Sequence, residues 1–120
     1  MNEYNFQHEG LRLTVTQLKD GFTIAWSGVS DSRSPGDFIN PITQRLVKQV
    51  RGREITIDVS ALEFMNSATV GPLISSVKAF EAAGKEVLVI FSNADWQRVH
   101  AQCTRTIAKT MSSVRVMIKS

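Results

Sequence analysis

The sequence predicts an α/β fold, a single domain built on a mixed and mainly parallel sheet. Apolar and polar residues alternate at strand period over 11–16, 22–26 and 54–59. Apolar residues recur at helical spacing over 38–50 and 70–80. Because helices alternate with strands after one hairpin, most neighbouring strands should be parallel.

The first two strands are expected to form an antiparallel hairpin. Lys19-Asp20-Gly21 lies between the segments 11–16 and 22–26. An Asp-Gly pair supplies the positive φ values of a tight turn. Residues 1–10 show no pattern, and we expect them to be a flexible N-terminus of the domain, which spans 1–120.

The first helix should begin at Ser34-Pro35-Gly36-Asp37. Ser34 is the expected cap, proline suits the first turn, and Asp37 completes a capping-box-like pair. Gly52 follows the helix and can take the left-handed conformation that ends it.

The third strand is expected over 54–59, with Asp58 near its end. A short turn then leads to a second helix that follows Ser67. Pro72 has no N–H group, so it is tolerated only in a first turn. Either the regular helix begins near Thr69 or the helix bends at its start.

The last third of the chain predicts a strand, a helix and a strand. Residues 87–91 form an unbroken apolar run, which suits a central strand. Ser92-Asn93 is the expected cap of a third helix, and 104–113 should be loop or helix end. Residues 114–118 alternate again and complete the order ββαβαβαβ. The predicted buried side of the third helix contains Trp96, Val99, His100 and Cys103.

Composition narrows the class of protein. No apolar run approaches the length of a membrane span, and the first ten residues do not resemble a signal peptide. Cys103 is the single cysteine, so an internal disulfide is excluded and a cytoplasmic location is the simplest expectation. No phosphate-binding glycine loop, catalytic triad or metal-ligand spacing is present, so we expect a non-enzymatic protein without cofactor or metal.

The C-terminal quarter is basic. Its charge suits either a solvated surface, which the sequence favours, or a contact surface for an acidic partner. Nucleic acid is disfavoured because no aromatic residues interleave with the charges. After Asp95 no acidic residue follows, and the cations are Arg98, Arg105, Lys109, Arg115 and Lys119.

Three short motifs stand out in the sequence: Ile57-Asp58-Val59-Ser60, Phe64-Met65-Asn66-Ser67 and Gly28-Val29-Ser30-Asp31. They resemble motifs of STAS domains, the fold of bacterial anti-sigma factor antagonists. The first resembles the ending of the family's third strand, the second its Phe-Met-Asp-Ser phosphorylation motif, and the third its Gly-Glu-Leu-Asp turn. Gly71 falls where the family often has a glycine. The resemblance covers about residues 11–118.

The resemblance implies that Ser67 is phosphorylated by a partner kinase, with Thr69 as a second choice. A phosphate is tolerated at a helix N-terminus. Position alone favours a plain capping serine instead. Two features depart from the family: Asn66 replaces an acid, and Ala68-Thr69 replaces a small pair that is often Ser-Gly. Asn66 keeps hydrogen bonding but loses a negative charge.

Asp31 has two interpretations. By resemblance it lies on the loop facing Ser67 and helps a kinase engage that serine; alternatively it forms a side-chain turn with its own backbone. Asp58 is expected to satisfy backbone groups rather than bind a metal. The residues expected to contribute to partner or kinase recognition are Asp31, Asn66, Ala68, Thr69 and Gly71.

These observations lead to an expected function with one alternative. The chain resembles an anti-sigma factor antagonist that binds an anti-sigma factor or GHKL-type serine kinase, is released by phosphorylation, and is reset by a PP2C-type phosphatase. The alternative is a STAS accessory subunit of a lipid-transport ABC complex. Neither direct membrane insertion nor nucleic-acid binding is expected.

Overall fold

The computed structural model describes residues 3–49 and 52–119. These residues form one six-stranded sheet and three helices. The elements, in chain order, are β1 (Glu3–His8), β2 (Leu11–Gln17), β3 (Gly21–Ser30), α1 (Gly36–Gln49), β4 (Glu54–Met65), α2 (Ser67–Ala82), β5 (Glu86–Phe91), α3 (Asp95–Ala108) and β6 (Val114–Ile118).

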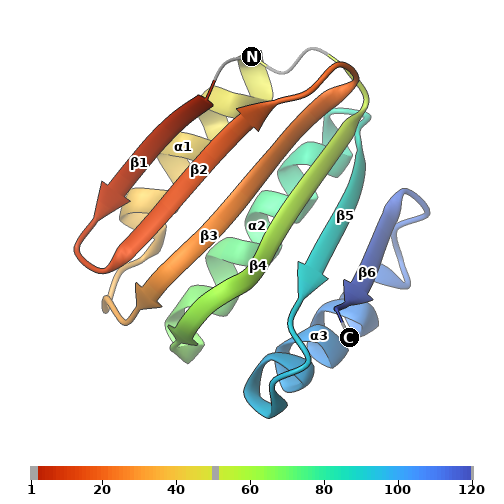
Figure 1. Cartoon of the computed structure of the whole chain (residues 1–120). Coiled ribbons are helices and arrows are strands. Elements are labelled where there is room, and N and C mark those ends of the chain that lie inside the picture. Colours follow the sequence, from red (N-terminus) through yellow and green to blue (C-terminus); the bar gives the residue numbers. More distant parts are fainter. Residues whose placement is uncertain (1–2, 50–51, 120) are drawn as a thin grey trace.

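The strands lie in the sheet in the order in which they occur in the chain, β1-β2-β3-β4-β5-β6. The first two pairs are antiparallel, and the pairs from β3 to β6 are parallel. Because successive parallel strands advance in one direction, right-handed crossovers place the helices on the same face. Figure 1 shows α1 and α2 behind the sheet and α3 beside β6. The predicted α/β class and mixed sheet are confirmed.

The core lies between the sheet and the helices. Trp26 on β3 is its largest buried side chain, and Phe80 on α2 is buried to the same extent. Ile39 on α1 and Leu73 on α2 pack into the same cluster. Truncating side chains of this kind to alanine costs about 2–5 kcal/mol in well-packed cores, so this layer holds the helices firmly against the sheet.

The N-terminal segment differs from the expectation of a flexible terminus. Residues 3–8 form β1, which pairs with β2 in register from Glu3↔Thr16 to His8↔Leu11. Glu9 at φ 54° and Gly10 make the turn between the two strands. The predicted element order therefore lacked one strand.

The start of α1 also differs from its expected cap. Ser34 accepts a hydrogen bond from the Asp37 N–H through its backbone carbonyl (3.1 Å), so backbone rather than side-chain bonding opens the helix. Gly52 has φ 99°, the left-handed conformation that was expected of it.

Strand β4 runs beyond its predicted end at Val59 and reaches Met65. Its pairing with β5 stops at Asp58↔Ile90, whereas its pairing with β3 continues to Ser30↔Met65 through two register shifts. Gly28, at one of these shifts, has φ 86°, a conformation that side chains with a Cβ rarely adopt. The part of β4 after Asp58, which pairs with β3 alone, leads directly to the start of α2.

Helix α3 has a different buried face from the one predicted. Its N-cap is Ala94, not Ser92-Asn93, and it continues to Ala108. The buried side chains are those of Gln97, Ala101 and Thr104. On the predicted side, Val99 is 68% exposed and Cys103 is exposed, while Trp96 and His100 are half-buried.

Candidate functional site

The junction between β4 and α2 places Asn66, not Ser67, at the N-cap of the helix. Asn66 has extended backbone angles (φ −78°, ψ 168°), and its side-chain oxygen accepts a hydrogen bond from the Thr69 N–H at 3.1 Å. The plain capping role considered for Ser67 therefore belongs to its neighbour. Ser67 is the first helical residue, and its side chain is exposed.

Thr69 is fully buried and belongs to a chain of hydroxyl hydrogen bonds. Its hydroxyl donates to Asn66 Oδ1 at 2.6 Å, and it lies 2.6 Å from Ser30 Oγ. Since the single Thr69 proton goes to Asn66, Ser30 donates to Thr69. The Thr69 side chain is 0% exposed, so its hydroxyl is inaccessible to a kinase in this conformation.

The amide group of Asn66 ties the loop between β3 and α1 to the start of α2. Its Nδ2 donates to the Ser32 carbonyl at 2.8 Å, and its backbone N–H donates to the Ser30 carbonyl at 2.9 Å. A carboxylate cannot donate, so aspartate at this position would place an oxygen against the Ser32 carbonyl. The asparagine is thus matched to the loop that faces it.

Asp31 lies in the chain between Ser30, the last residue of β3, and Ser32, and the carbonyls of both neighbours accept hydrogen bonds from Asn66. The side chain of Asp31 is exposed. The side-chain turn considered for it is formed instead by Ser32, whose Oγ accepts from the Ser34 N–H at 3.1 Å. The Asp31 carboxylate is exposed to solvent, and its role opposite Ser67 stays a prediction.

An exposed surface surrounds Ser67. Ala68 and Gly71 are exposed, and a Cβ added at Gly71 would meet no atom within 4 Å. Phe64, just before the junction, is 49% exposed. We call Asp31, Phe64, Ser67, Ala68 and Gly71 the α2 N-terminal surface; it combines small side chains, one aromatic ring and one carboxylate.

The electrostatics of this helix start favour an anion. The first turn of α2 contains no acidic residue. The opening N–H groups of a helix lack intrahelical acceptors and carry the positive end of its dipole. Within the described part of the chain the Ser67 hydroxyl has no hydrogen-bond partner. A phosphate on Ser67 would therefore meet favourable partial charge without disrupting an existing bond.

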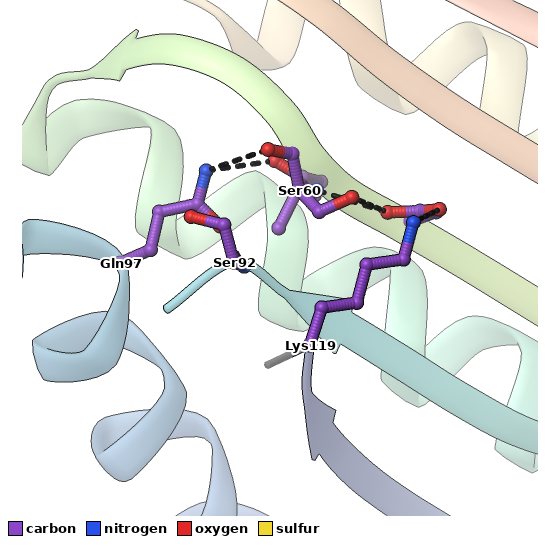
Figure 2. Close-up of polar contacts among 6 residues, drawn as sticks. Ser60, Ser92, Gln97 and Lys119 are labelled. Carbon is purple, nitrogen blue, oxygen red and sulfur yellow. Dashed lines mark hydrogen bonds and ion pairs between the residues drawn. The ribbon is translucent and has the colours of Figure 1, made fainter. Parts of the chain in front are cut away.

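Gln97 is a structural residue of the neighbouring junction that the sequence did not indicate. Its Nε2 donates to the carbonyls of Val59 (3.0 Å) and Leu62 (3.2 Å), and its Oε1 accepts from the Ser92 N–H at 2.6 Å. Figure 2 shows Gln97 reaching from α3 toward the β4 backbone at Ser60. Gln97 thus replaces β5 as the partner of β4 after the two strands separate.

Asp58 has the structural role that was expected, although it lies within the strand. Its Oδ1 accepts from the backbone N–H of Ser60 (2.9 Å) and from the Ser60 hydroxyl (2.5 Å). Its Oδ2 lies 3.6 Å from Lys119 Nζ, and Figure 2 shows that lysine extending toward β4. Asp58 therefore joins β4 to the C-terminal end of β6.

The described residues contain no group of three or more His, Cys, Asp or Glu side chains placed to hold a metal ion. None of the helices in 3–49 and 52–119 is long and apolar enough to cross a membrane.

Comparisons with known proteins identify the fold. No protein-family model matches the sequence, and no curated protein matches it significantly. Among solved structures, the activator SiaC in the complex with diguanylate cyclase SiaD from Pseudomonas aeruginosa has a TM-score of 0.65 and 11% identity, covering 97% of this chain and 99% of its own. The anti-sigma factor antagonist SpoIIAA in its unphosphorylated form has a TM-score of 0.63 and 16% identity, covering 90% of this chain and 88% of its own. The chain therefore has a STAS-like fold.

Proposed function

We propose that this protein is a non-enzymatic regulator of the anti-sigma factor antagonist type. Its α2 N-terminal surface binds a partner protein while Ser67 is unmodified. Phosphorylation of Ser67 by a partner kinase weakens that complex. Catalysis belongs to the partners, and the switch is a local change of charge.

The single observation that carries this proposal is the state of Ser67. It is exposed, its hydroxyl is unbonded within the described residues, and it begins a helix without an acid in its first turn. The buried position of Thr69 favours Ser67 over the second choice. An added phosphate gains from the helix dipole inside this chain but must be desolvated in an interface shaped for a hydroxyl.

The similar structures support a role in protein binding. SpoIIAA is described as an anti-sigma factor antagonist, and SiaC as the activator of a diguanylate cyclase. For this chain we propose an anti-sigma factor or GHKL-type serine kinase as the partner. A PP2C-type phosphatase would then restore the unmodified serine, and all three proteins would meet in the cytoplasm.

A second candidate function is a STAS accessory subunit of a lipid-transport ABC complex. The structural role of Asn66 favours it, because that residue is committed to the loop at Ser32 rather than to a kinase motif. In this role the same surface would contact a transporter subunit permanently, and Ser67 would remain unmodified.

The test compares three variants for binding to the partner by calorimetry. Ser67→Ala should bind as the wild type does, since it removes only an unbonded hydroxyl. Ser67→Asp should bind about tenfold or more weakly, because a charge must be desolvated. Ser75→Asp is the matched control: it adds the same charge to an exposed position of α2 two turns away, and should change affinity less than about twofold.

Incubation with the kinase and ATP, followed by mass spectrometry, should locate phosphate on Ser67. Phosphate on Thr69 alone would move the switch and require local opening of α2. Absence of phosphate, together with wild-type affinity of Ser67→Asp for the kinase, would contradict the proposal and favour the accessory subunit.

A further inference from the structure

Strand β6 is an edge of the sheet. Of its outward groups, the Val114 N–H donates to the Met111 carbonyl at 3.4 Å, whereas those of Val116 have no backbone partner among the described residues. Two hydrogen bonds at the ends of β6, Val87 N–H to Ser113 C=O (2.9 Å) and Lys119 N–H to Phe91 C=O (2.8 Å), fix which residues face β5. Because backbone direction alternates along a strand, the odd-numbered residues of 113–119 pair with β5. The N–H and C=O groups of Val116 therefore point away from the sheet.

A groove lies beside this edge on the helix-covered face. It has a volume of about 290 Å³ and is lined by Arg105, Ala108 and Lys109 of α3 and its C-terminal end, and by Val114 and Val116 of β6. The floor is apolar and the rim carries two cations. Such a groove suits a side chain with a short hydrocarbon stem and a terminal carboxylate, which is the structure of glutamate.

The two groove cations are uncompensated. Neither Arg105 nor Lys109 forms an ion pair with a described residue, whereas Arg98 pairs with Asp95 at 2.8 Å. No acidic residue occurs between residues 96 and 119. The net positive potential of this region is therefore concentrated at the groove.

The opposite face of β6 differs in charge. Arg115 lines a small hollow together with two acids, Glu54 and Glu86, although it forms no ion pair with either of them. A ligand that follows β6 would therefore meet unbalanced positive charge on the helix side alone. This asymmetry specifies which face of an added strand should be acidic.

We propose that the outer edge of β6 binds an extended acidic segment of a partner protein, which adds a seventh strand to the sheet. Backbone hydrogen bonds to Val116 would hold the segment. Alternate glutamates would place their methylene groups on the valines and their carboxylates against Arg105 and Lys109. This surface is separate from the α2 N-terminal surface and does not depend on the proposed role of Ser67.

A competing explanation is that the cations only protect an edge strand from aggregation. The opposite edge of the sheet argues against a general device of this kind, because β1 contains neither lysine nor arginine over Glu3–His8. The groove cations also come from α3 and its end rather than from the edge strand itself.

The test is an NMR titration of the full chain with an octapeptide in which glutamate and valine alternate. The amide signals of Val116 and Ile118, which face outward, should shift more than those of Arg115 and Met117, which face β5. A control peptide with proline in place of each valine carries the same charge but cannot form a regular strand, and it should leave Val116 unshifted.

Variants of the chain sharpen the result. Replacing Arg105 and Lys109 together by glutamine should weaken binding of the octapeptide about tenfold, since charge-assisted contacts are lost. Arg98→Gln, which removes a cation already paired with Asp95, should change it less than about twofold. Val116→Pro removes the outward donor without removing a bond to β5, and should also weaken binding.

Three outcomes would overturn the proposal. Equal responses to the valine and proline peptides would reduce the site to unspecific charge attraction. Amide shifts confined to other surfaces, or no amide shifts at millimolar peptide, would mean that β6 does not bind the peptide. The groove cations would then only protect the edge strand from aggregation.

Discussion

Two strand-to-helix junctions lie side by side in this sheet, and their helix starts are completed in opposite ways. At the β4–α2 junction, Asn66 caps the helix with its side chain, and the first turn contains no acid. At the β5–α3 junction, Ala94 provides no side-chain cap, and Asp95 places a carboxylate in the first turn. At the start of α2, the half-buried Asn66 side chain therefore supplies the hydrogen bond of the cap, and no acidic side chain of the first turn neutralises the positive end of the helix dipole.

The difference teaches where an anion can be added. At α3, Asp95 already occupies the positive end of the helix and pairs with Arg98 at 2.8 Å, while Gln97 fills the space between the strands. At α2, the polar side chains of Asn66 and Thr69 turn inward, and Ser67 faces solvent. The β5–α3 junction is structural, whereas the β4–α2 junction has an exposed position that can accept a charged group.

The largest loss of stability should follow from removing the Gln97 side chain from the β5–α3 junction. Gln97→Ala removes two donors from buried β4 carbonyls and the acceptor of the Ser92 N–H, and should lower the free energy of unfolding by about 3 kcal/mol. Urea denaturation measures the loss. Gln102→Ala, on the exposed side of the same helix, is the control and should cost less than about 0.5 kcal/mol. If the two variants have similar free energies of unfolding, Gln97 does not stabilise the β5–α3 junction, and the contrast between the two junctions is wrong.

A smaller loss of stability should follow at the β4–α2 junction when Asn66 is replaced by aspartate, the residue of the STAS motif that this segment resembles. Asn66→Asp keeps the cap of Thr69 and gains from the helix dipole, but loses the bond to the Ser32 carbonyl and sets two oxygens against each other. We expect a net loss of about 1 kcal/mol, measured by thermal unfolding. Asn93→Asp, exposed before α3, should change stability by less than about 0.5 kcal/mol. A stabilised Asn66→Asp protein would show that the loop does not select asparagine.

The smallest effect concerns His100 on α3. Burial lowers the pKa of His100 below its ordinary value of 6.5. The unfolded chain therefore binds more protons than the folded chain just below that pH, so stability should rise as the pH is raised toward 6.5 and then level off. His100→Gln should flatten this part of the profile. Identical pH profiles for wild type and His100→Gln would contradict this assignment.

Hydrophobic periodicity predicted most of the sheet but not the orientation of α3. The strands at 87–91 and 114–118 follow from apolar side chains that contact the core directly. In α3 the buried positions include Gln97 and Thr104, whose polar groups are satisfied by hydrogen bonds to β4 and to the preceding turn. A pattern that counts apolar residues cannot anticipate a buried amide that donates to carbonyls 35 or more residues earlier in the chain.

The candidate site was predicted in its location but not in its bonding. The strand-turn-helix pattern placed Ser67 at a helix start, which the structure confirms. The caps could not be assigned from sequence, since Asn66 and Ser67 are both good capping residues in adjacent positions. The choice is made by Ser30 and Ser32, which approach from another strand and loop.

The order of strands in the sheet has a consequence for how the chain folds. Every hydrogen-bonded pair in β1–β6 joins strands that are consecutive in the chain, so no pairing has to wait for a distant segment to return. Closure of each pair costs the loop entropy of at most one helix and its turns. The sheet can therefore grow strand by strand during synthesis, from the antiparallel N-terminal strands toward β6. For a mixed α/β domain this keeps the sequence separation between paired strands low, and low separation favours faster folding.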